Sequence, residues 1–219
     1  MDATWDRIAP SLSDDALLLA ETAHRTLNEI SAALAALSLL RAGRGLEDRV
    51  GLLDGAIARL NGFAAATRLL AGPWCGDVDL VGRTEELWRA TVDARRAAGS
   101  SMLVLDPGCG RVPSAVGRRA LLVLAELMSN ALRHAVADGR GTIAVVVSRC
   151  AGGLLLAVED DGPGLPPGGA RREEGMGGPI VSELVRRGGS TIECETGPRG
   201  TAFRVVLPVT SQPGPGEPF

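Results

Sequence analysis

One of the two histidines in the chain lies in a polar strip whose residue types could do chemistry. Glu21, His24, Asn28 and Ser31 recur at intervals of three and four residues, so a helix would place them on one face, beside an apolar seam. A neutral imidazole can attack a phosphorus atom, and a carboxylate one turn away can take the ring proton or hold the tautomer. An inert surface histidine fits the same pattern, so both interpretations stay open at this point.

A second polar set lies at helical spacing in the middle of the chain. Glu126, Asn130, Arg133 and His134 would share one face of a helix whose other side is an apolar stripe. An amphipathic helix with a solvated polar face would look similar. The stripe consists of Leu121, Leu124, Leu127, Met128, Ala131 and Leu132.

A glycine-rich turn follows the strand predicted at residues 154–159, and it reads Asp160-Asp161-Gly162-Pro163-Gly164. A carboxylate at the end of a strand can accept a hydrogen bond from the exocyclic amine of adenine, and the glycines let the backbone turn tightly and approach a base. Gly175 and Gly177 precede the helix predicted at 179–187 and would offer backbone N–H groups to phosphates. An ordinary surface turn has a similar composition, so the glycines alone do not decide.

Taken in order, these segments resemble the N box (125–135), the G1 box (158–166), the G2 box (175–178) and the closing Gly-Thr strand (200–203) of the GHKL ATPase superfamily. That group includes the ATP-binding domains of histidine kinases, gyrase-type proteins and anti-sigma kinases. The resemblance covers roughly residues 80–208. It implies a Bergerat-type α/β sandwich that binds ATP and Mg²⁺.

The resemblance also implies roles for the matching residues. Asn130 would be a Mg²⁺ ligand, and Glu126, one turn earlier, would support the metal and its water. Arg133 would contact a phosphate, and Thr201 would line the adenine pocket. His134 would lie near the base, although a structural role fits its position equally.

The pattern Glu-x-x-His-Arg-x-x-x-Asn around His24 resembles the H box of kinases related to the HWE family, in which arginine follows the acceptor histidine. It implies autophosphorylation of His24 from ATP, with Glu21 and Asn28 as supporting residues, and transfer to an aspartate on a response-regulator receiver. Two departures place the chain nearer a sister group: Val158-Glu159-Asp160 replaces the Trp-x-Glu of the HWE G1 box, and Ala125 replaces the histidine before the N-box glutamate.

Two other functions share parts of this pattern. A histidine phosphotransferase would use the same hairpin to relay phosphate between receivers without ATP. An anti-sigma-type GHKL protein with serine kinase activity would have a similar N box, but it would not need a long helical hairpin with an exposed histidine.

The elements that must position these residues begin with two long helices, predicted at 14–41 and 50–71 around the turn Ala42-Gly43-Arg44-Gly45. One hairpin cannot cover both of its apolar seams, so we expect two copies to form a four-helix bundle, which is a homodimer. A hairpin covered by the rest of its own chain is the alternative. The seams comprise Ala20, Ala23, Leu27, Ile30, Leu34 and Leu37, then Val50, Leu53, Ile57, Leu60, Ala64 and Thr67.

We assign residues 1–72 to this dimerisation and phosphoacceptor hairpin, 73–208 to the ATP-binding domain and 209–219 to a disordered Pro/Gly-rich tail. The middle segment predicts an α+β fold, with helices on one face of a mostly antiparallel sheet. Its predicted helices are 79–97, 115–137 and 179–187, and its predicted strands are 101–105, 142–148, 154–159, 191–195 and 202–207.

Composition excludes several other classes. The net charge of −3, without a basic block, argues against nucleic acid as the main partner. No apolar run approaches the roughly 20 residues of a membrane span, and the N-terminus lacks the basic region of a signal peptide. The four cysteines are widely spaced, so we expect reduced thiols in a cytoplasmic protein. Residues 1–13 are too few for a sensor domain, so we expect input from a separate protein.

Overall fold

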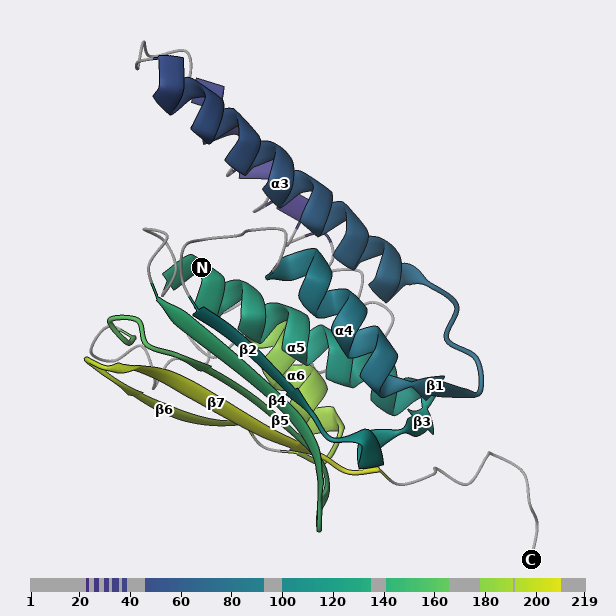
Figure 1. The fold of residues 1–219 in the computed structure, drawn as a ribbon. Helices are drawn as coiled ribbons and strands as arrows, with labels where there is room; N and C mark the ends of the chain where they lie inside the picture. The colour runs from purple at the N-terminus through teal and green to yellow at the C-terminus, as the bar shows by residue number, and fades with distance from the viewer. Residues whose placement is uncertain are drawn as a thin grey trace, which may run out of the picture.

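The computed structural model of the chain describes most of the segment from Leu46 to Val209. In full, it covers residues 46–92, 100–134, 141–165, 178–190 and 192–209, with helical residues at 23, 26–27, 30–31, 33–35 and 37–38. Helices α4, α5 and α6 lie together on one face of a sheet, so the predicted α+β sandwich is confirmed (Figure 1). In the described part of the chain, no helix is long and apolar enough to cross a bilayer.

The main sheet has five strands in the order β2-β4-β5-β7-β6. β2 pairs with β4 in parallel, and the other pairs are antiparallel. Buried and partly exposed residues alternate along β4 and β7, as expected for strands with one face on the core. The strand bounds are Ser100–Leu105 (β2), Thr142–Cys150 (β4), Gly153–Asp160 (β5), Ile192–Gly197 (β6) and Gly200–Leu207 (β7).

Helix α5 (Ser114–His134) is the centre of the core. Every residue from Ala120 to Ser129 is buried, because α5 packs on the sheet on one side and on α4 and α6 elsewhere. The predicted apolar stripe is therefore confirmed. The segment 135–137, where the sequence predicted the helix to end, lies outside the described residues.

Helix α4 (Leu80–Thr91) begins at a side-chain cap, where Gly82 N–H donates to Asp79 Oδ1 at 3.1 Å. It ends at Thr91, before the predicted end at residue 97, and residues 93–99 are outside the described part. A two-stranded sheet of β1 (Asp77–Asp79) and β3 (Arg111–Pro113) flanks it. The sequence analysis missed both strands, since three residues are too few to show alternation.

Helix α3 (Leu46–Ala71) runs past the helical layer, and its N-terminal part projects away from the sandwich (Figure 1). Its last turns join the core, where Ala66 is buried and Leu69 and Leu70 pack against the same cluster. The seam predicted for this helix stays exposed, with 40–53% of each large residue accessible to solvent. These exposed seam residues are Val50, Leu53, Ile57 and Leu60, and Leu27, Ile30, Leu34 and Leu37 on the preceding helix are exposed as well.

The segment after α3 is fixed to α4 by one aromatic residue. Trp74 Nε1 donates to Leu70 O at 2.9 Å, and the guanidinium of Arg83 lies 4.8 Å from the centre of the Trp74 ring. Arg83 Nη1 also contacts Leu69 O at 3.5 Å. The connection between α3 and the sandwich is therefore held by packing and by polar contacts in this structure.

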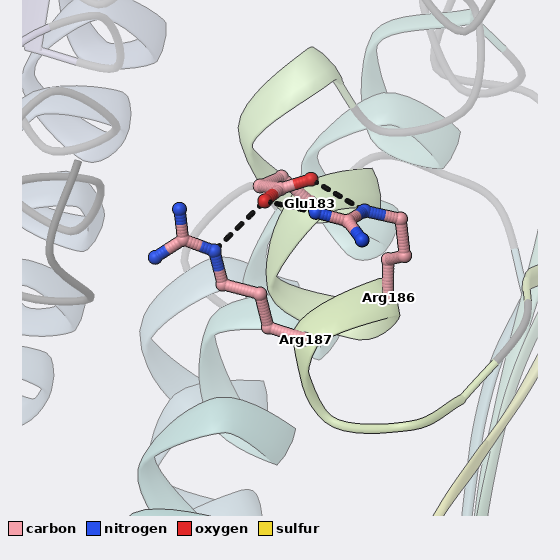
Figure 2. A network of polar contacts seen from close by, with 3 residues as sticks. All are labelled: Glu183, Arg186 and Arg187. Atoms are coloured by element: carbon pink, nitrogen blue, oxygen red, sulfur yellow. Dashed lines mark hydrogen bonds and ion pairs between the residues drawn. The ribbon is translucent and has the colours of Figure 1, made fainter. Parts of the chain in front are cut away.

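Helix α6 (Gly178–Arg187) carries a compact charged network on its last turns. Glu183 accepts hydrogen bonds from Nε and Nη2 of Arg186 at 2.8 and 2.6 Å, and from Nε of Arg187 at 2.8 Å (Figure 2). The bonds from Arg186 and then from Arg187 hold the pKa of the Glu183 carboxyl below its ordinary value. The two arginines also complement the negative end of the helix dipole.

Candidate functional site

Asp160 is the last residue of β5, and its carboxylate is held by backbone donors from two directions. Gly162 N–H donates to Asp160 Oδ1 at 3.0 Å, and Thr201 N–H donates to the same oxygen at 3.3 Å. Thr201 lies directly opposite Asp160 in the β5–β7 register and is buried. One carboxylate oxygen is thus oriented by protein backbone, which fixes the direction of the whole group.

The neighbouring Asp161 has a different hydrogen-bond partner. It faces β4, where Thr142 N–H donates to Asp161 Oδ1 at 2.6 Å and Asp161 N–H donates back to Thr142 O. The backbone bond from Thr142 is the main reason that the pKa of Asp161 lies below its ordinary value. Asp161 therefore joins two strands, whereas Asp160, the residue that the sequence analysis singled out, bonds to the loop after β5 and to β7.

The negative charge of Asp160 affects the pKa of a cysteine on β6. The pKa of the Cys194 thiol is raised, first by burial and then by the negative charges of Asp160 and Glu195. The neutral thiol is therefore favoured beside the carboxylate. Cys194 is therefore a partly buried, uncharged side chain near this end of the sheet.

The loop after β5 requires glycine at position 164. Gly164 has φ +77°, and a Cβ added there would meet Gly197 O well inside the 3.0 Å below which such contacts essentially never occur. Leu165 N–H donates to Thr196 Oγ1 at 2.8 Å, and that oxygen lies 3.2 Å from Thr201 Oγ1. The loop is thus pressed against the β6–β7 turn, which explains Gly164 and brings Thr196 into the site.

The sequence analysis missed Thr196, because it ended the predicted strand at residue 195. The structure extends β6 to Gly197, where Thr196 pairs with Thr201 across the turn. A signal was present: the two threonines flank Gly197-Pro198-Arg199-Gly200 symmetrically, so a tight hairpin makes them cross-strand partners.

The N-box residues lie on α5, which packs against β5 and β7. Glu126 is 8% exposed, Asn130 is half-buried one turn later, and Arg133 is exposed at the C-terminal end. His134 ends the helix, and its side chain is outside the described part. Burial of these three polar side chains therefore decreases toward the C-terminal end of α5.

The structure does not test the remaining assignments. Gly175 and Gly177 lie outside the described residues. Glu21, His24 and Asn28 lie outside them as well, although the neighbouring residues Ala23 and Thr26 are helical. The residues brought together are therefore Asp160, Gly162, Gly164 and Thr201, with the newly found Thr196.

Residues 115–211 match the family described as histidine kinase-, DNA gyrase B-, and HSP90-like ATPase. The matched segment contains all but the first residue of α5, the Asp160 loop and the closing strand β7. This part of the chain is therefore similar to that ATPase family, as the ordered boxes predicted.

Two curated relatives support the assignment. The C4-dicarboxylate transport sensor protein DctB of Rhizobium meliloti (strain 1021) is 41% identical over 107 residues, which are 42% of this chain and 17% of the relative. Blue-light-activated histidine kinase 2 of Erythrobacter litoralis (strain HTCC2594) is 33% identical over 104 residues, which are 46% of this chain and 30% of the relative. The similarity thus spans less than a third of either relative.

Solved structures share the fold over a longer part of the chain. The histidine kinase domain of the Erythrobacter litoralis EL346 blue-light activated histidine kinase has a TM-score of 0.59 at 22% identity, over 84% of this chain and 97% of that one. A bacterial phosphotransferase has a TM-score of 0.58 at 16% identity, over 89% of this chain and 97% of that one. At these identities the likeness shows a shared fold alone.

Proposed function

We propose that the chain is a protein-histidine kinase that transfers the γ-phosphoryl group of ATP to His24 and then to an aspartate on a response-regulator receiver. One observation carries the proposal. The residues that the ATPase resemblance assigns to the base site, namely Asp160, Gly162, Gly164 and Thr201, meet at one end of the sheet, inside the segment that matches the ATPase family.

Asp160 is the adenine-reading group in this proposal. Its Oδ1 is held by Gly162 N–H and Thr201 N–H, so the carboxylate keeps one direction before any ligand binds. The exocyclic amine of adenine donates to such a group, whereas guanine presents a carbonyl oxygen at the same position and would be repelled. The site should therefore prefer adenine nucleotides.

Glu126 and Asn130 fit a magnesium ion that arrives with the nucleotide. Among the described residues there is no group of three or more His, Cys, Asp or Glu side chains that could hold a metal by themselves. Mg²⁺ is usually bound through one or two protein oxygens, with phosphate oxygens and water completing its shell. A buried carboxylate and a half-buried amide one turn apart supply such oxygens. When bound, the ion would neutralise charge on the β- and γ-phosphates.

The chemical step is a substitution at phosphorus. A ring nitrogen of His24 forms a bond to the γ-phosphorus while the bond from that phosphorus to the β,γ-bridging oxygen breaks, and ADP leaves. Glu21, one turn before His24, accepts the proton from the other ring nitrogen or holds it in a hydrogen bond. Asn28 lies one turn after His24 on the same helix face. Transfer to a receiver aspartate then regenerates the imidazole.

The exposed hairpin seam supports a homodimer. On α3, Ala66 in the last turns packs on the core, while Leu53 and Ile57 stay exposed. Its own chain therefore leaves the seam uncovered, and a second hairpin would complete a four-helix bundle. In this assembly the receiver docks on the His24 face. ATP and receiver domains are cytoplasmic, so we place the kinase there.

Labelled ATP with magnesium tests the proposal on the full chain. Label on the protein should be acid-labile and should vanish in His24→Ala and Asn130→Ala, while Arg89→Ala, an exposed change on α4, should keep it. If wild type takes no label from ATP but accepts it from a phosphorylated receiver, the chain is a histidine phosphotransferase. Acid-stable label on an added protein would favour the anti-sigma-type serine kinase. Either of these two results would refute the proposal.

A further inference from the structure

Thr196 links two segments that are distant in sequence. It is the penultimate residue of β6, and its hydroxyl oxygen accepts a hydrogen bond from Leu165 N–H at 2.8 Å. The same oxygen lies 3.2 Å from Thr201 Oγ1 on β7. A single side chain therefore connects the loop after β5 with the strand that closes the site.

These contacts complete a ring of hydrogen bonds around the end of β5. Asp160 Oδ1 accepts from Gly162 N–H in the loop and from Thr201 N–H on β7. Thr201 contacts Thr196 through its hydroxyl, and Thr196 accepts from Leu165 N–H, which returns to the same loop. Because hydrogen bonds in such networks support one another, removal of one member loosens the rest.

We propose that Thr196 is a positioning residue for nucleotide binding, an inference that rests on the ATP site of the proposed function. Its hydroxyl holds the Gly162–Leu165 backbone and, through Thr201, the direction of the Asp160 carboxylate. Without it, the loop has to be ordered when the nucleotide binds, and the conformational entropy lost at that moment reduces affinity.

The hydroxyl can be separated from the rest of the side chain. Thr196→Val keeps the shape and removes the acceptor, so Leu165 N–H loses its partner. Thr196→Ser keeps the acceptor and removes only a methyl group. Loss of one hydrogen bond of this kind corresponds to about a five- to tenfold change in an equilibrium constant. We expect the dissociation constant for ADP to rise by about that factor in Thr196→Val and to change less than about twofold in Thr196→Ser.

The experiment is calorimetric titration of the full chain with ADP and magnesium, with a melting curve of each variant without nucleotide. Thr84→Val is the matched control, since Thr84 is buried on α4 and its hydroxyl donates to Leu80 O at 2.7 Å, away from the loop. It should lower the melting temperature and leave ADP affinity unchanged. If Thr196 had a purely structural role, Thr196→Val would likewise lower the melting temperature and leave ADP affinity unchanged.

Wild-type affinity in Thr196→Val would overturn the inference. It would also be overturned if Thr196→Ser bound as weakly as Thr196→Val, because methyl packing would then explain the effect. If wild type itself showed no ADP binding, the proposed function would fail first and the inference with it. The two failures are therefore distinguishable in one set of titrations.

Discussion

Gly164 offers the sharpest test of the loop geometry, through the substitution Gly164→Ala. Its φ of +77° costs an L-residue about 1–2 kcal/mol. The new Cβ would also lie against Gly197 O, and the loop would have to retreat by about 1 Å to reach an ordinary C···O separation near 3.3 Å. A shift of that size stretches the 2.8 Å bond from Leu165 N–H to Thr196 beyond hydrogen-bonding range, at a cost of about 1 kcal/mol.

The expected loss in free energy of unfolding is therefore about 2–3 kcal/mol, measured by urea denaturation. Affinity for ADP with magnesium should fall about tenfold or more. Gly76→Ala is the matched control, because Gly76 also has positive φ, +61°, but a Cβ there would meet nothing within 4 Å. It should cost about 1–2 kcal/mol from strain alone and should not weaken ADP binding. Equal effects of the two substitutions on stability and on affinity would refute the reasoning.

Three further predictions concern the charged network, the α3–α4 connection and the hairpin. Glu183→Gln should lower the free energy of unfolding by about 1 kcal/mol at pH 7. Because the folded pKa of Glu183 lies below its ordinary 4.5, that difference should persist above pH 5 and vanish as the pH falls below 4.5. Arg83→Ala removes the cation–π contact with Trp74, worth about 0.5–1 kcal/mol, and should speed subtilisin cleavage near residues 71–76. Ile57→Asp should convert a dimer to a monomer in light scattering.

Each of these predictions has a control variant or a result that would contradict it. A loss from Glu183→Gln that is unchanged at pH 3 would contradict the role of its charge. Arg89→Ala removes another arginine of α4, paired with Glu85 and not with Trp74, and should not speed cleavage. Asp54→Ala, an exposed polar position on α3, should leave the dimer intact. Monomeric wild type at micromolar concentration would contradict the assembly.

The sequence predicted the elements whose signal is local and repetitive. The apolar stripe from Leu121 to Leu132 identified α5, and alternation identified β4, β5 and β7 within a few residues. Asp160 was distinguished from Asp161 by the resemblance to the G1 box, and the structure gives the two side chains different partners. The α+β architecture followed from the order of these elements.

The parts that were missed depend on contacts between distant segments. Strands β1 and β3 are too short to show a pattern and exist because they pair with each other. The pairing of Thr196 with Thr201 has a local signal in the hairpin turn, but its bond from Leu165 N–H joins a loop some 30 residues earlier, which no local window could reveal. The clash that requires glycine at 164 likewise comes from Gly197 across the sheet. That α5 would be buried on nearly all sides was also not evident, since its polar residues suggested a solvated face.

The most direct test of the account is titration of the full chain with a non-hydrolysable ATP analogue, beside Asp160→Asn and Asp161→Asn. Asp160 Oδ1 accepts two backbone hydrogen bonds, so an amide there would keep its oxygen in that place and turn its N–H₂ group toward the adenine amine. We predict saturable binding by wild type, a loss of about tenfold or more in Asp160→Asn, and little change in Asp161→Asn, whose side chain bonds to Thr142 instead. No binding by wild type, or equal binding by all three proteins, would contradict the assignment of an ATP site to this end of the sheet.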